Sequence, residues 1–232
     1  MLKIYPKEQL GHAKYSWLNT RYHFSFSNYY NPTRMNFGSL RVINDDIIAA
    51  KTGFDPHPHD NMEIITYVRK GAITHKDSMG NEGKTNAGDV QVMSAGTGVV
   101  HAEYNLEDED TILYQIWITP KKRDVEPRWE QREFPKDFVD DKLKLIVSGQ
   151  EDSDGIYIHQ DAEIYAGRIK SGNQIKHNLK APAYILISEG EVTLNDQTLK
   201  AGDGAEVFEI DTLNIDSKQD CEILVIEIAD AA

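Results

Sequence analysis

Short apolar segments rich in β-branched and aromatic residues recur along the whole chain. They cover residues 64–68 (IITYV), 112–118 (ILYQIWI), 143–147 (LKLIV), 184–187 (YILI) and 222–228 (EILVIEI). Pairs of glycine, asparagine and aspartate lie between such segments, as is typical of tight turns. No long stretch has the 3.6-residue periodicity of an amphipathic helix. The pattern therefore predicts an all-β protein of antiparallel strands arranged in sandwiches or barrels.

A weak internal repeat indicates two similar β-units. The first copy is VRKGAIT at 68–74 followed by NAGD at 86–89, and the second is ISEGEVT at 187–193 followed by LKAGD at 199–203. Each copy reads as a strand, a turn glycine, a second strand and an Ala-Gly-Asp turn. A repeat of this size predicts two related units and not a solenoid.

A charged segment with several prolines separates the two copies. Residues 120–142 contain Pro120, Pro127 and Pro135 and form the predicted linker. We therefore expect an N-terminal domain over residues 1–130 and a C-terminal domain over 131–232.

Composition and charge limit the classes of partner. The 232 residues carry a formal net charge of −13 at pH 7, and such a surface repels the phosphate backbone of nucleic acids. No apolar run is long enough to span a bilayer, and the first residues lack the apolar centre of a signal peptide. Cys221 is the single cysteine, so no intrachain disulfide forms. We expect a cytoplasmic protein without direct contacts to nucleic acid or membrane, and a protein partner stays open.

Two histidine motifs carry the candidate chemistry. His57-Pro58-His59 precedes the segment at 64–68, and His101-Ala102-Glu103 follows the glycine-rich turn at 95–98. In an extended strand, residues i and i+2 point to the same face. Three imidazoles and one carboxylate therefore converge if the two strands are neighbours. This nitrogen-rich set without thiolates suits one divalent transition metal with open positions, and it suits calcium or structural zinc poorly.

Two glutamates compete for the carboxylate position. Glu103 shares a face with His101, whereas Glu63 follows His59 by four residues, and we favour Glu103. The second half of the chain has no His-x-His pair, and we interpret His159 and His177 as isolated surface or strand-end residues. We therefore expect the N-terminal domain, residues 1–130, to bind the metal and the C-terminal domain, residues 131–232, to bind none. His75 is interpreted as structural.

Further motifs make the sequence similar to the pirin family of the cupin superfamily, most closely to bacterial pirin-like proteins with quercetin 2,3-dioxygenase activity. The resemblance is dense in the N-terminal half and loose in the C-terminal half. It rests on GHA at 11–13, HFSFSNYY at 23–30, LRVINDD at 40–46, HPH at 57–59, HKDS at 75–78, MSAGTG at 93–98, HAE at 101–103 and QIW at 115–117.

The resemblance implies a bicupin, in which two antiparallel jelly-roll β-barrels pack face to face. It also implies that His57, His59, His101 and Glu103 hold one divalent transition metal per chain. Glu63 is then a candidate to contact these ligands without binding the metal itself. Iron(II) is the first expectation, and copper, nickel, manganese and zinc are the alternatives.

The implied activity is that of a quercetin 2,3-dioxygenase. A flavonol such as quercetin, a small aromatic chelating substrate, would bind through its 3-hydroxyl and 4-carbonyl, and Glu103 would accept the hydroxyl proton. Reaction with O2 would then open the central ring and release carbon monoxide. The alternative class is a metal- and redox-dependent regulator that binds a protein partner, as animal pirins resemble transcriptional cofactors. A third alternative is that flavonol cleavage is incidental, and that the true ligand is another aromatic chelator or a metabolic enzyme. We expect a monomer.

Overall fold

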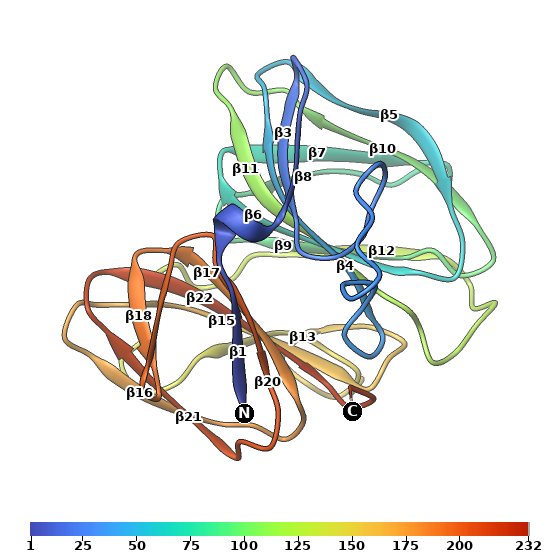
Figure 1. The fold of residues 1–232 in the computed structure, drawn as a ribbon. Coiled ribbons are helices and arrows are strands. Elements are labelled where there is room, and N and C mark those ends of the chain that lie inside the picture. Colours follow the sequence, from blue (N-terminus) through green and yellow to red (C-terminus); the bar gives the residue numbers. More distant parts are fainter. Residues whose placement is uncertain (232) are drawn as a thin grey trace. The chain divides into compact units, whose positions relative to one another are not determined.

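The computed structural model describes residues 1–231 and consists almost entirely of β-strands (Figure 1). Two compact units are present, and both are discontinuous in the chain. The N-terminal unit contains Gly11–Pro135 and Ile158–Gln160. The C-terminal unit contains Met1–Leu10, Lys136–Tyr157 and the chain from Asp161 onward. The domain boundary after residue 130 stays a prediction.

The N-terminal unit is built from a seven-stranded and a four-stranded antiparallel sheet. The larger sheet has the order β12-β9-β6-β11-β4-β3-β2. Its strands are β2 (Gly11–Lys14), β3 (Leu18–Tyr22), β4 (Leu40–Ile48), β6 (Glu63–Lys70), β9 (Val90–Ser94), β11 (Thr111–Ile118) and β12 (Arg128–Arg132). The smaller sheet has the order β5-β10-β7-β8. Its strands are β5 (Thr52–His59), β7 (Ala72–Asp77), β8 (Glu82–Asn86) and β10 (Val99–Asn105).

The C-terminal unit also has a seven-stranded and a four-stranded sheet, which are antiparallel except for the parallel pair of β13 and β14. The larger sheet has the order β1-β20-β17-β22-β15-β13-β14, and the smaller has the order β16-β21-β18-β19. The strands of the larger sheet are β1 (Leu2–Tyr5), β13 (Lys144–Ser148), β14 (Ile156–Tyr157), β15 (Ala162–Ile169), β17 (Ala183–Glu189), β20 (Gly204–Val207) and β22 (Cys221–Ile228). Those of the smaller sheet are β16 (Gln174–Asn178), β18 (Glu191–Leu194), β19 (Gln197–Lys200) and β21 (Thr212–Ser217). A short 3-10 helix, η1 (Lys7–Gln9), follows β1.

The repeat predicted from the sequence is visible in the strand order. The run β9-β6-β11-β4 corresponds to β20-β17-β22-β15, and β5-β10-β7-β8 corresponds to β16-β21-β18-β19. The turn glycines of the two copies, Gly71 and Gly190, have φ angles of 75° and 79°. Only glycine adopts this left-handed conformation readily, which explains its recurrence at this position.

The predicted linker contains a strand that the sequence pattern did not indicate. β12 lies within residues 120–142 and pairs with β9, placing Trp129 opposite Met93. In the C-terminal unit, β1 pairs with β20 at the corresponding edge. Residues 128–132 form a strand because they pair with the edge of the sheet at β9. The local pattern of charges and prolines cannot predict this pairing, since it depends on a distant part of the chain. No helix in the described residues is long and apolar enough to cross a membrane.

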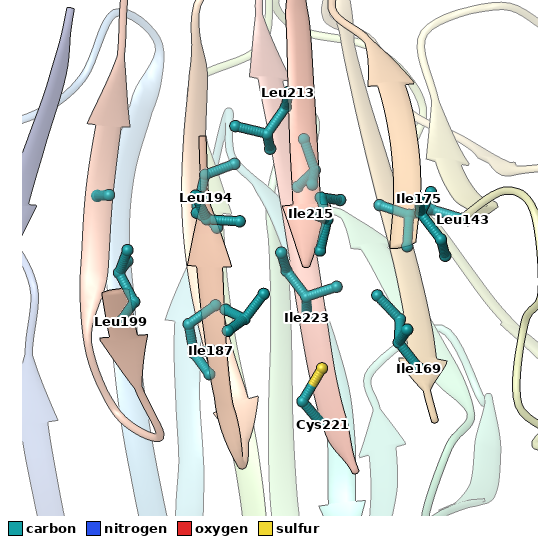
Figure 2. Close-up of a cluster of buried hydrophobic side chains, with 14 of the residues drawn as sticks. Leu143, Ile169, Ile175, Ile187, Leu194, Leu199, Leu213, Ile215, Cys221 and Ile223 are labelled. Carbon is teal, nitrogen blue, oxygen red and sulfur yellow. The ribbon is translucent and has the colours of Figure 1, made fainter. Parts of the chain in front are cut away.

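The interior of the C-terminal unit is filled by aliphatic side chains. Leu194, Leu213, Ile215 and Ile223 are at most 1% exposed and belong to one buried cluster (Figure 2). Figure 2 shows these side chains gathered among the strands that carry them.

Candidate metal centre

The histidines of the two motifs converge in the N-terminal unit. β5 and β10 are antiparallel neighbours, as the motifs required, and His101 lies directly opposite His57. The ring centroids of His57 and His101 are 4.5 Å apart, and His59 lies 4.8 Å from His57 and 5.0 Å from His101. One nitrogen from each of the three rings lies within 4.8 Å of the others. The three imidazoles can therefore share one ion.

The pKa values of His59 and His101 fit a metal site. Burial, together with neighbouring His57 and His75, lowers the pKa of His101 to about 3. Burial and the adjacent His101 and His57 rings lower the pKa of His59 to about 4. The Nδ1 atom of His57 lies 2.7 Å from the carbonyl oxygen of Asp55, and donation there leaves Nε2 with its lone pair. Neutral imidazoles with a free nitrogen are the form that binds a metal.

His101 provides a second sign that the site suits an ion. Its Nε2 atom is buried and has no hydrogen-bond partner anywhere in residues 1–231. A buried ring nitrogen without a partner is costly unless it coordinates something. Nitrogen-rich donor sets favour transition metals, so the residues present fit the predicted class of ion.

Glu103 lies beside His101 and is held firmly by polar neighbours. Its Oε1 accepts hydrogen bonds from Gln91 Nε2 at 2.6 Å and Thr66 Oγ1 at 3.2 Å, and its Oε2 accepts one from Gln115 Nε2 at 2.8 Å. Glu103 groups with His101 and His75 as a set that could hold an ion, and not with His57 and His59. The carboxylate is thus close to the histidine triad but fixed by amide donors.

A chain of polar contacts on the far side of His101 can determine the tautomer of that ring. His75 Nε2 lies 3.0 Å from Asp77 Oδ2, and His75 Nδ1 lies 3.4 Å from His101 Nδ1. Although burial raises the pKa of Asp77, hydrogen bonds from Asn81 and His75 lower it overall, so Asp77 is ionised at neutral pH. Donation from His75 to Asp77 leaves His75 Nδ1 to accept from His101 Nδ1, which turns the bare Nε2 of His101 toward an ion.

This chain gives His75 a role that the sequence interpretation did not assign. His75 is fully buried and stacks on Trp129 at a centroid distance of 4.9 Å. The signal was present in the sequence, because His75-Lys76-Asp77 has the same i, i+2 spacing as the two ligand motifs. His75 is thus placed to orient the His101 ring.

We predict that His75→Phe weakens metal binding by about 10–100-fold, the usual effect of losing a partner that orients a ligand. Phenylalanine keeps the stacking on Trp129 but cannot accept the proton of His101. Metal affinity is measured by competition with a chelator. His12→Gln serves as control, because His12 is an exposed histidine that contacts Asn19. Equal affinities of the His75→Phe variant and the wild type would contradict the positioning role.

Glu63 has a different environment from Glu103. It begins β6, is 1% exposed, and its Oε2 accepts a hydrogen bond of 2.6 Å from Ser94 Oγ. It is not among the residues that line the cavity described below. Burial raises the pKa of Glu63 to about 7, against the lowering effect of hydrogen bonds from Ser94 and the His159 backbone and of the Arg128 charge.

This pKa predicts a pH-dependent effect of Glu63→Gln on stability. Because the folded-state pKa lies above the ordinary value of 4.5, the folded protein binds the extra proton, and stability falls as pH rises from about 4.5 to 7. The variant should therefore be more stable than the wild type at pH 8, by about 3 kcal/mol, with the difference fading towards pH 5. Urea unfolding in EDTA at both pH values measures this. A pH-independent difference would show that the carboxyl is ionised throughout.

The triad opens into a cavity of about 720 Å³ in the N-terminal unit. Aromatic rings form much of its wall, with Trp17 edge-on to Phe54 at 5.0 Å and Phe26 edge-on to Trp117 at 5.3 Å. The lining residues are Trp17, Phe26, Asn44, Asp46, Thr52, Gly53, Phe54, Asp55, His57, His59, Ile64, His101, Glu103, Tyr104, Gln115 and Trp117. A cavity of this size and character is typical of sites for small aromatic molecules.

The sequence analysis interpreted His177 as an isolated residue, but in the C-terminal unit it lies next to a carboxylate. Its Nε2 lies 2.9 Å from Glu227 Oε1, and its ring packs edge-on against Tyr165. β16 carries His177, and distant β22 carries Glu227, so sequence spacing could not reveal the pair. The groups of candidate ligands in the described part of the chain, His57-His59-His101 and His75-His101-Glu103, both belong to the N-terminal unit.

Two antiparallel β-barrel units, one of them with a histidine triad inside, define a bicupin. Comparison with known families identifies both units. The Pirin family model matches residues 4–118, and the model of the quercetinase C-terminal cupin domain matches residues 145–228. The chain belongs to the pirin family, which confirms the resemblance of its motifs.

Relatives cover the whole chain. A Pseudomonas aeruginosa protein provisionally named quercetin 2,3-dioxygenase is 50% identical over 232 residues, which span 99% of this chain and 100% of the relative. The Escherichia coli protein named quercetin 2,3-dioxygenase is 40% identical over 98% of this chain and 99% of its own. The crystal structure of the bacterial pirin YhhW from Escherichia coli in complex with nickel(II) has a TM-score of 0.92 at 38% identity and covers 99% of each chain.

Proposed function

We propose that the protein is a metal-dependent dioxygenase that cleaves flavonols such as quercetin with O2 and releases carbon monoxide. The observation that carries this proposal is the opening of the histidine triad into a cavity with aromatic walls. The names of relatives at 40–50% identity support the same substrate class.

In this proposal His57, His59, His101 and Glu103 hold one divalent transition metal, with iron(II) as the first expectation. Bound there, the ion would supply Lewis acidity and open coordination positions. The nickel(II) complex of a related pirin supports a transition metal and leaves its identity to experiment.

The residues around the triad would bind and orient the substrate. Trp17, Phe54 and Trp117 offer apolar faces and edges to a planar ring system. Trp117 also packs edge-on against His59 at 4.9 Å, which restrains that ring. A flat aromatic substrate would therefore be guided to the triad with its chelating edge foremost.

Glu103 would accept the proton of the substrate hydroxyl. It lines the cavity at 3% exposure, and donors from Gln91, Gln115 and Thr66 fix the direction of its carboxylate. A positioned carboxylate of this kind acts as a general base.

The decisive experiment is incubation of quercetin in air with protein loaded with iron(II), and in parallel with nickel(II) or manganese(II). We expect loss of the flavonol absorbance near the visible edge together with release of carbon monoxide. Samples without O2 and samples of His101→Ala at the same metal concentration should show neither. Stoichiometric metal without turnover in any loaded form would instead favour a regulator that binds a protein partner.

A further inference from the structure

Two polar side chains of β4 line the cavity. Asn44 and Asp46 stand two residues apart on this strand, so both point to the same face. They are 5% and 2% exposed. Asp45 between them points to the other face, where its Oδ1 accepts a hydrogen bond of 2.8 Å from Arg69 Nη2.

The Oδ1 atoms of Asn44 and Asp46 are both buried and have no hydrogen-bond partner in the part of the chain that the structure describes. The carboxyl of Asp46 as a whole is not without a neighbour, because Thr20 lies opposite Asp46 on β3 and its hydroxyl interacts with that carboxyl. Gln115, opposite Asn44 on β11, donates instead to Glu103. Buried acceptors are nearly always satisfied, and leaving one open costs free energy. Two open acceptors on one wall of a cavity therefore call for donors on whatever occupies it.

We propose that Asn44 and Asp46 form a subsite that binds the hydroxyl groups of a polyhydroxylated aromatic substrate, at a part of the molecule away from its chelating edge. The inference rests on the proposed function and narrows it. It assigns to the cavity a preference for substrates with several ring hydroxyls over substrates with the chelating group alone.

The surroundings favour hydroxyl donors over an ammonium group. A divalent ion held by His57, His59 and His101 repels a second cation in the same cavity. The aromatic wall formed by Trp17 and Trp117 suits a ring that carries the donors. A phenolic hydroxyl combines the flat apolar face with the donor that the two oxygens lack.

The test compares two flavonols that share the 3-hydroxy-4-carbonyl group. Quercetin carries further hydroxyls on both outer ring systems, and 3-hydroxyflavone carries none. Binding of each to nickel(II)-loaded protein is measured without O2 by calorimetric titration. We expect the wild type to bind quercetin at least about tenfold more tightly, the scale of one or two hydrogen bonds to a buried acceptor.

Asp46→Leu should lose most of this preference while its affinity for 3-hydroxyflavone stays within about twofold of the wild type. Asp46→Asn retains one carbonyl acceptor and should lose a smaller part. Asn44→Leu provides the same test if Asp46→Leu does not fold. Asp45→Asn is the matched control, because it removes a carboxylate from the same strand on the opposite face, and its affinity ratio should equal that of the wild type.

The outcomes separate the subsite from the proposed activity. Binding of both flavonols with an unchanged ratio in Asp46→Leu and Asn44→Leu would overturn the subsite. A ratio that falls as expected, without turnover in air, would support the subsite and overturn the dioxygenase. Failure of the wild type to bind either flavonol would overturn both.

Discussion

His101→Ala is expected to abolish stoichiometric metal binding and still fold, whereas the wild type is expected to hold one ion per chain. His101 lies opposite His57 and presents the one ring nitrogen of the triad that is buried without a partner. The barrel does not depend on it, because aliphatic side chains such as Ile48, Val68 and Leu113 form a separate buried cluster. Elemental analysis of protein purified without added metal, together with thermal unfolding, measures both expectations.

His57→Ala should behave in the same way, since it removes the facing ligand. His177→Ala is the matched control, because it removes a histidine next to a carboxylate in the C-terminal unit and should leave one ion bound. One tightly held ion in folded His101→Ala would mean that the proposed ligand set is wrong.

The spacing of the two motifs predicted that His57 and His59 share one face, and that His101 meets them if the two strands are neighbours. Side-chain alternation is a geometric property of any strand, so His57 and His59 had to share a face. Pairing of β5 with β10 was a hypothesis at that stage, because local spacing does not determine which distant strands are neighbours. The observed register, with His101 opposite His57, confirms that hypothesis. The strand patterns and the internal repeat predicted two related all-β units, and the resemblance to the pirin family predicted that these units are barrels.

Contacts that depend on register between other strands were not predictable in the same way. His75 on β7 reaches His101 only because β7 is the other neighbour of β10, with Asp77 opposite His101. The open acceptors of Asn44 and Asp46 depend on where their neighbours direct their own hydrogen bonds, as Gln115 does toward Glu103. Which donor pairs with which acceptor depends on the packing of the whole unit, and no periodic pattern in the sequence indicates it.

Glu103→Gln is expected to keep much of the metal but to lose about 10²-fold or more of the flavonol turnover, the usual range for a general base. Three imidazoles remain to hold the ion in this variant. The amide matches the carboxylate in shape, and rotation of the Gln91 and Gln115 amides can restore the hydrogen bonds around it. Loss of turnover would then reflect the missing proton acceptor and not a rearranged cavity. Steady-state kinetics with quercetin and metal analysis of the same preparation provide the two numbers.

The matched comparison is Glu63→Gln, which makes the same chemical change at a second buried glutamate of the N-terminal unit. Glu63 is held by Ser94 and is absent from the cavity wall, whereas Glu103 lines the cavity beside His101. Glu63→Gln should therefore change stability at high pH and leave kcat for quercetin within about twofold of the wild type. The opposite pattern, with an inactive Glu63→Gln and a nearly normal Glu103→Gln, would transfer the role of proton acceptor to Glu63. Loss of metal from Glu103→Gln in proportion to its loss of turnover would instead make Glu103 a ligand only, because the remaining loaded molecules would then turn over normally.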